Sequence, residues 1–166
     1  MARAAALVLL FLCLFGAASA ESYATFADAL NQDRFSQLKA VINNIGIMST
    51  FQNPQLAVTV FAPDNNAFAK AAASSPVSID QLMGSKGLLQ QIVYYGIVQG
   101  AVSAPLPAQQ FDTLLSGKQL TGAGMQVQGI GSSATITEPN VKCGAGLAHI
   151  VDNVLLFVDL GFGRRR

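Results

Sequence analysis

The sequence predicts an α+β fold in which a sheet, formed mainly by the second half of the chain, is covered by helices from the first half. Before Gly100, apolar residues recur at helical spacing. After Gly100, they alternate with polar residues, as in half-buried strands. One short run in the first half, residues 58–61, is β-branched or aromatic and predicts a buried strand that joins the sheet.

The first 20 residues predict a signal peptide. Arg3 supplies a positive charge, residues 4–15 form an apolar run too short to span a bilayer, and residues 18–20 form a small-x-small cleavage site. A signal anchor, which is the alternative, would need a longer apolar run. We therefore expect cleavage before Glu21 and a secreted, extracellular protein with no membrane span.

The remaining chain has the size and charge of one neutral domain. Removing 20 of the 166 residues leaves 146, which is enough for a single domain with a sizeable core, at residues 21–160. Loss of Arg3 also leaves nine basic and nine acidic side chains. With no basic stripe in the domain, nucleic-acid binding is not expected.

The basic tail at residues 161–166 has two interpretations: it is a solvated chain end, or it attracts acidic polysaccharide. Its arginines are Arg164, Arg165 and Arg166.

Helical spacing marks most of the first half. Phe26, Ala29 and Leu30 share one helical face, and a second set ends at Gly46. The last helix before Gly100 is apolar on nearly every side, which predicts a central, buried element. We expect helices near residues 22–30, 35–45, 65–73, 79–83 and 88–98.

Residues 59–68 form a joint between the buried strand and the helix that follows it. Pro63 removes a backbone donor, and the carboxylate of Asp64 is suited to cap the helix, with a calcium site as the alternative use of its oxygens. Phe61 precedes the turn and Phe68 follows it. We therefore expect both rings to pack in one core that the sheet and the helix share.

The second half is predicted to consist of strands and turns. Pro105 and Pro107 predict an extended linker, after which apolar and polar residues alternate. Glycine-rich turns are expected at residues 122–124 and 129–131. Strands are expected at residues 111–115 and around Leu120, with a turn at residues 117–118 between them, and further strands near residues 125–127, 134–137 and 149–158.

The residues that could carry chemistry are few. His149 is the only histidine, and Asp152 lies three positions away on a predicted strand, which places the two side chains on opposite faces. No Gly-x-Ser-x-Gly elbow supports a hydrolase. Cys143 and His149 are too few ligands for a zinc site. We therefore expect a buried, hydrogen-bonded His149, and neither a cofactor nor a metal.

Two further residue types have a structural and a functional interpretation. Cys143 is the only cysteine after the signal peptide, and we expect a small buried hydrophobe, with an intermolecular disulfide as the alternative. Tyr94 and Tyr95 could stack on a sugar ring. Since the chain has no tryptophan, a core position or a hydrogen-bonded tyrosine is the preferred interpretation.

Two stretches resemble the signatures of fasciclin-like (FAS1) domains. Residues 59–68, Thr-Val-Phe-Ala-Pro-Asp-Asn-Asn-Ala-Phe, are similar to the first, and residues 146–156, Gly-Leu-Ala-His-Ile-Val-Asp-Asn-Val-Leu-Leu, to the second. The segments around Tyr95 and residues 113–117 are similar to the stretches between them, so the resemblance covers nearly all of residues 21–158. The signature positions are Thr59, Phe61, Ala62, Pro63, Asp64, Phe68, Tyr95, His149, Asp152 and Leu155.

This resemblance implies a wedge-shaped β-sandwich with a helical cap, and a non-catalytic role in cell adhesion or extracellular-matrix binding. Glu138, Pro139 and Asn140 resemble an acidic loop that some members use to bind integrins, but Asn140 stands where aspartate is expected and Gly96 stands where histidine is common. Both departures argue against integrin binding by this route. We expect an extracellular protein or polysaccharide as the partner and leave the oligomeric state open. The alternative is a small extracellular ligand carrier or hydrolase on the same fold.

Overall fold

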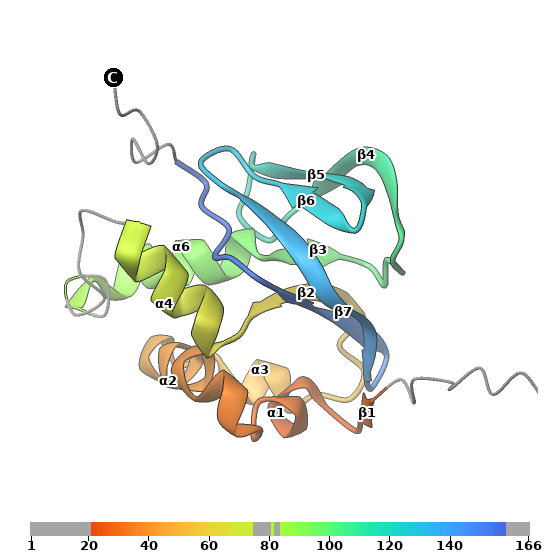
Figure 1. The fold of residues 1–166 in the computed structure, drawn as a ribbon. Helices are drawn as coiled ribbons and strands as arrows, with labels where there is room; N and C mark the ends of the chain where they lie inside the picture. Colours follow the sequence, from red (N-terminus) through yellow and green to blue (C-terminus); the bar gives the residue numbers. More distant parts are fainter. Residues whose placement is uncertain (1–20, 75–80, 82–83, 159–166) are drawn as a thin grey trace, which may run out of the picture.

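The computed structural model describes residues 21–74, 81 and 84–158 (Figure 1). The predicted signal peptide, all but one residue of the predicted helix at 79–83, and the basic tail lie outside these residues. Within them the α+β class is confirmed, with most helices in the first half and most strands in the second. The helices are α1 (Phe26–Ala29), the 3-10 helix η1 (Asp33–Phe35), α2 (Ser36–Ile45), α3 (Met48–Phe51), α4 (Asn65–Ser74) and α6 (Lys86–Tyr95). The strands are β1 (Ser22–Tyr23), β2 (Val58–Pro63), β3 (Ile97–Gln99), β4 (Leu106–Asp112), β5 (Gln119–Gly124), β6 (Gln126–Gln128), β7 (Ser133–Cys143) and β8 (Gly146–Val151).

The strands of the described residues form one sheet in the order β3-β2-β8-β7-β6-β5-β4, and β1 pairs in parallel with β7. The long strand β7 belongs to both halves of this sheet, since it pairs with β8 along one part and with β6 along another. The two end strands also approach each other. Val98 bridges to Thr113, and the Leu114 N–H donates to the Ile97 carbonyl at 2.9 Å. The sheet therefore curls over on itself and is nearly closed.

The cap helices α1, α2 and α3 lie together at one end of the molecule, and β4, β5 and β6 lie at the opposite end (Figure 1). The longest of the three, α2, buries Leu38, Val41, Ile42 and Ile45, which recur at helical spacing. It ends at Gly46, whose φ of 80° lies in the left-handed region where glycine is favoured. The sequence thus specifies both the buried face of this helix and its end.

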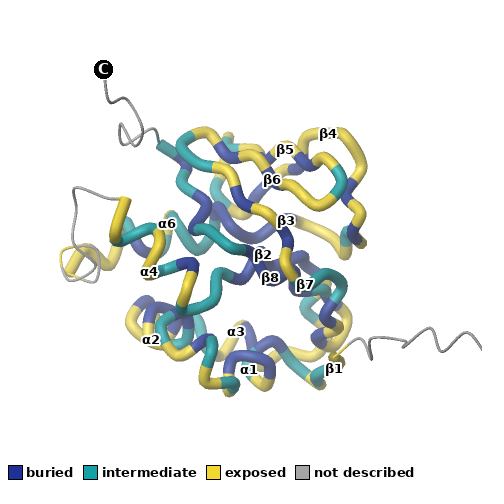
Figure 2. The backbone as a smooth tube through the Cα atoms, in the orientation of Figure 1, coloured by how far each residue is buried: buried dark blue, intermediate teal, exposed yellow. Residues whose placement is uncertain are grey.

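Strands β2 and β8 are buried on both faces (Figure 2). Because side chains alternate along a strand, Val60 and Ala62 face the cap helices while Phe61 faces the other way. The cap core consists of Phe26, Ala29, Leu30, Phe35, Leu38, Ile42, Phe51, Val58, Val60, Ala62, Ile97, Val141, Cys143, Ala148 and Ile150. The strand core consists of Phe61, Tyr95, Val98, Ala104, Leu106, Phe111, Leu120, Val127, Ala134, Ile136, Val151, Leu155 and Phe157.

This division corrects the prediction that Phe61 and Phe68 share one core. Phe61 is buried in the strand core, whereas Phe68 on α4 is only partly buried and packs against the cap core. The reason is the orientation of α4, which covers the Val60 and Ala62 face of β2.

The predicted helix at residues 88–98 ends three residues too late. Helix α6 ends at Tyr95, and Ile97–Gln99 form β3, antiparallel to β2. Gly96 lies between the two elements, and its carbonyl accepts a hydrogen bond from the Phe61 N–H at 2.8 Å. Pairing with β2 thus competes successfully with continuation of the helix.

Two segments predicted to be irregular are strands. The linker around Pro107 belongs to β4, which is the last strand in the sheet order, so a proline there interrupts no central ladder. Gly122 belongs to β5 and not to a turn. A Cβ at Gly122 would lie 2.6 Å from Cε2 of Phe111, so this glycine allows close packing within the strand core.

Other boundaries also differ from the prediction. The described residues begin with the short strand β1 where a helix was expected, and the single-turn helix α3 was not predicted. Strand β7 is much longer than the predicted residues 134–137, because two register shifts let it continue past Glu138. Strand β8 begins earlier and ends earlier than the predicted residues 149–158.

Candidate functional site

Thr59 is the second residue of β2 and is fully buried. Its hydroxyl donates to the Gly100 carbonyl at 2.7 Å and accepts from the Val102 N–H at 2.7 Å. Both partners belong to the irregular segment that connects β3 to β4. Thr59 therefore supplies the backbone of this segment with the hydrogen bonds that no strand provides.

His149 is fully buried on the neighbouring strand β8. Its Nδ1 accepts from the Asn140 N–H at 3.0 Å, and its Nε2–H donates to the Val102 carbonyl at 2.8 Å. These two partners fix the neutral tautomer with the proton on Nε2. Burial lowers the pKa of His149, although the Val102 carbonyl acts in the opposite direction. The imidazole is therefore held neutral, with both nitrogens occupied.

Asn140 completes the arrangement from β7. Its side-chain oxygen accepts from the Ala104 N–H at 2.8 Å, and its side-chain nitrogen donates to the Ala104 carbonyl at 2.9 Å. The residue has a φ of 60°, which asparagine tolerates better than most residues. We call Thr59, His149 and Asn140, with their backbone partners in residues 100–104, the connector network.

The connector network corrects the prediction of an acidic loop at Glu138, Pro139 and Asn140. These residues lie within β7, at its register shifts, and all three are partly buried. Asn140 is committed to Ala104, and Glu138 forms an ion pair with Arg34 at 2.6 Å. The segment therefore offers less to a partner than an exposed loop would.

His149 and Asp152 do not form a dyad. One oxygen of Asp152 accepts from the Thr135 N–H at 2.8 Å and the other from Lys70 Nζ at 3.2 Å. Burial alone would raise the pKa of Asp152, but the hydrogen bonds from Thr135 and Lys70 lower it. This carboxylate thus links α4 to the end of β8, and it has no role beside the imidazole.

Asp64 caps α4, as predicted. Its carboxylate accepts from the Ala67 N–H at 2.8 Å, which satisfies one of the free donors at the start of the helix. The neighbouring Asn65 accepts from the Gln37 N–H at 3.1 Å and donates to the Asp33 carbonyl at 2.9 Å. These side chains therefore connect the start of α4 to the start of α2, and within the described residues no group of three or more acidic, histidine or cysteine side chains is arranged to hold a metal ion.

Tyr95 and Cys143 are buried. The Tyr95 hydroxyl donates to the Gln119 carbonyl at 3.0 Å and accepts from the Ile130 N–H at 2.9 Å, so this ring is not available to stack on a sugar. Burial raises the pKa of the Cys143 thiol to about 12. A buried, protonated thiol fits the predicted small hydrophobe and disfavours the intermolecular disulfide.

No residue pattern in the sequence indicates the partners of the connector network. Val102 takes part through its backbone N–H and carbonyl, and Ala104 does so as well. Backbone groups leave no residue pattern. The available signal for this network was the presence of three polar residues without an obvious role, Thr59, His149 and Asn140.

The comparisons with known proteins agree with this geometry. The fasciclin domain model matches residues 33–157, most of the chain. The chain belongs to the fasciclin (FAS1) domain family. It is 31% identical over 138 residues to immunogenic protein MPB70 of Mycobacterium bovis, covering 77% of this chain and 66% of that protein. It is 29% identical over 132 residues to the uncharacterized protein sll1735 of Synechocystis, covering 77% of this chain and 93% of that protein.

A solved structure supports the same fold. The FAS1 domain pair of the insect cell adhesion molecule Fasciclin I aligns with a TM-score of 0.58 and 24% sequence identity, over 74% of this chain and 45% of that chain. In the present FAS1 domain the two signature stretches form adjacent parallel strands, with Phe61 paired to His149. The signature stretches thus form two adjacent interior strands of the sheet. None of the helices in the ranges described is long and apolar enough to cross a membrane.

Replacing Thr59 by valine should lower the free energy of unfolding by about 1–3 kcal/mol, because the Gly100 carbonyl and the Val102 N–H would lose their buried partner. Urea unfolding measures the change. The matched control is Thr121→Val, an exposed position on β5 that should change stability by less than about 0.5 kcal/mol. Equal effects at the two positions would contradict the role assigned to Thr59.

Proposed function

We propose that this FAS1 domain is secreted and acts as a non-catalytic interaction module that binds an extracellular protein or polysaccharide. The FAS1 family is known for adhesion-related roles, which supports the general class. The observation that carries the proposal is the connector network, in which the conspicuous polar residues of the signatures are committed to holding the fold. A hydrolase would need an accessible base, and both nitrogens of His149 are occupied. We therefore expect the partner to bind at the surface of the domain.

The surface that fits this role best is formed by two turns at one end of the sheet. Antiparallel pairing places the turn after β4 and the turn after β6 at the same end. Leu114 in the first turn is 39% exposed, and Ile130 in the second is 55% exposed. The buried Tyr95 hydroxyl holds the two turns together through its hydrogen bonds to the backbone of Gln119 and Ile130. Two apolar side chains are thus presented on a fixed backbone, which lowers the entropic cost of binding.

The test combines a binding panel with two matched variants. Immobilised collagen, heparin and chondroitin sulfate are exposed to the protein, and the dissociation constant of any complex is measured. The double variant Leu114→Ser with Ile130→Ser should bind about tenfold more weakly or worse, since each lost apolar contact is worth roughly 1 kcal/mol. Met125→Ser, at an exposed position between β5 and β6 at the opposite end, is the control and should bind normally. Absence of binding to any matrix component, or a double variant as tight as the control, would contradict the proposal.

The basic tail is a separate candidate contact for acidic polysaccharide. Deleting Arg164, Arg165 and Arg166 should weaken binding to heparin, and the difference from the full chain should shrink as salt rises, because exposed charges are screened. The melting temperature should not change. Heparin binding that is indifferent to the deletion at low salt would remove the tail from the proposed contacts.

A further inference from the structure

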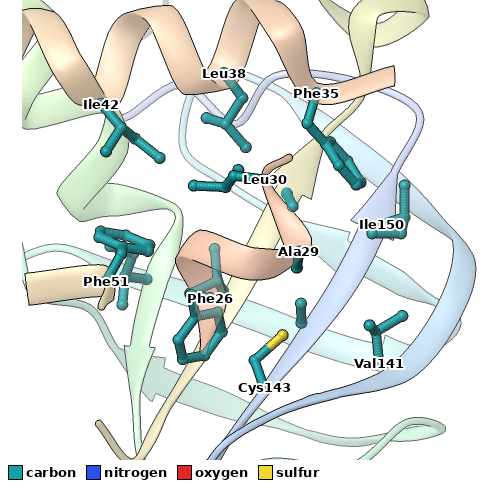
Figure 3. Close-up of a cluster of buried hydrophobic side chains, with 14 of the residues drawn as sticks. Phe26, Ala29, Leu30, Phe35, Leu38, Ile42, Phe51, Val141, Cys143 and Ile150 are labelled. Carbon is teal, nitrogen blue, oxygen red and sulfur yellow. The ribbon is translucent and has the colours of Figure 1, made fainter. Parts of the chain in front are cut away.

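A cavity of about 890 Å³ lies between the cap helices and the sheet, and it extends beneath α4 and α6. Its helical wall includes Phe26, Leu30 and Leu38, and its floor on the sheet includes Ala62, Ala148 and Ile150. Figure 3 shows the side chains of the cap core from both sides pointing toward the space between the two layers. Leu114 and Ile130 do not line this cavity, although the turn after β6 contributes Gly131 and Ser132 to its wall.

The size of the cavity is unusual for a plain core. Protein interiors are close-packed and contain few voids larger than a water molecule. Pockets that hold small molecules, by comparison, measure roughly 300–1,000 Å³ and are mostly apolar. The floor carries alanine at positions 62 and 148 on adjacent strands, where a larger side chain would fill the space. An apolar cavity offers water few hydrogen-bond partners. It therefore stays dry and can take up hydrocarbons instead.

We propose that the cavity binds a single long-chain apolar ligand with an uncharged oxygen head group, such as a long-chain alcohol or an acyl ester. This inference goes beyond the proposed function and does not depend on it. The chain of the ligand would lie between the cap core and the sheet. The head group would lie at Arg34, which lines the cavity.

The surroundings of Arg34 select an uncharged head group. Its two terminal nitrogens form ion pairs with Glu138 at 2.6 Å and with Glu21 at 3.0 Å. Both terminal nitrogens are thus already paired with carboxylates, and the carboxylate of a fatty acid would have to displace one of them. The Nε–H of Arg34 is shielded from solvent and has no acceptor among the described groups. An alcohol or ester oxygen could accept that hydrogen bond without adding charge.

The other cationic residue among the described ones that line the cavity does not change this preference. Lys70 on α4 is paired with Asp152 at 3.2 Å, and its side chain is largely exposed. A carboxylate head group at that place would compete with Asp152 and with water. Lys70 therefore provides a weaker anion site than its charge suggests.

The first experiment measures head-group preference with purified protein. Nile red serves as a neutral fluorescent probe, and 1-dodecanol and dodecanoate compete for the site at pH 7.5. We expect a fluorescence increase with one probe per chain, and displacement by dodecanol at a concentration about tenfold below that of dodecanoate. Arg34→Lys, which keeps the charge but lacks Nε–H, should reduce the affinity for dodecanol about tenfold, the value of one hydrogen bond to a charged donor. Stronger displacement by dodecanoate, or no probe binding, would overturn the proposal.

The second experiment locates the site by filling it. Ala62→Leu and Ala148→Leu each place a larger side chain on the floor of the cavity and should reduce Nile red binding about tenfold or more. Ala123→Leu makes the same change at an exposed position on β5 and should bind the probe normally. Filled variants that bind like the wild type would overturn the proposal.

A measurement on the unmodified chain covers the case in which a filled variant does not fold. In methyl NMR spectra, dodecanol should shift the signals of Ala29, Ala62 and Ala148, which line the cavity. The methyl group of Ala134, in the strand core, is the internal control and should not move. Shifts confined to the exposed Leu114 and Ile130, or no shifts at all, would show that the cavity does not bind the ligand.

Discussion

Replacing Phe61 by alanine is expected to lower the free energy of unfolding by about 3–5 kcal/mol, the usual cost of removing a buried phenylalanine. The ring is 4% exposed in the strand core, and its centroid lies 5.6 Å from that of the His149 imidazole. Its removal leaves a cavity beside the connector network, where the surrounding strands cannot readily collapse. Urea unfolding measures the loss as a lower midpoint at unchanged slope.

Phe68→Ala is the matched comparison. Phe68 is only partly buried on α4, so its truncation should cost about 1–2 kcal/mol, which is less than full burial would give. Equal losses at the two positions would indicate a single shared core, as the sequence alone predicts, and would contradict the arrangement of two cores on opposite faces of β2.

His149→Ala should cost about 3 kcal/mol or more in free energy of unfolding. The substitution removes a fully buried ring and leaves the Asn140 N–H and the Val102 carbonyl without a partner. The cost of a cavity and the cost of two unsatisfied backbone groups act together. Thermal unfolding followed by circular dichroism measures the change.

The same variant should alter the dependence of stability on pH. Burial lowers the pKa of His149 in the folded state, so as pH falls below the ordinary histidine value of about 6.5 the unfolded chain binds a proton that the folded chain resists. Wild-type stability therefore falls between about pH 6.5 and the lowered folded pKa, and it is fully present above pH 6.5. The carboxylates are common to both proteins. Parallel stability curves for wild type and His149→Ala between pH 7.5 and 5.5 would contradict a buried, neutral imidazole.

Much of the fold could be predicted from the sequence, because the signals were local. The buried strand β2 and the cap at Asp64 depend on adjacent residue types, and both are confirmed. The pairing of Ile97–Gln99 with β2 could not be predicted, since a short apolar run is compatible with helix and with strand. The sequence also does not determine which face of β2 the helix α4 covers. Alternation fixes that Phe61 and Val60 point in opposite directions but not which of them meets the helix.

The site was less predictable than the fold. The signature residues could be identified by resemblance, yet the role of Asn140 depends on the backbone of Ala104, which lies 36 positions away in the chain. A contact of this kind leaves no local pattern, and the resemblance of residues 138–140 to an acidic loop therefore does not reveal that they lie within β7. The exposed Leu114 and Ile130 likewise became notable only when the register of β4 to β7 placed their turns at one end.

The most direct test asks whether the signature site holds the fold or contacts the partner. The dissociation constant of His149→Ala for the matrix component captured by the wild type is measured at a temperature where circular dichroism shows that both proteins are folded. If the connector network is structural, the two constants agree within about twofold. A folded His149→Ala protein that binds about tenfold more weakly, while Leu114→Ser with Ile130→Ser binds normally, would show that the signature site itself makes the contact and would contradict this account.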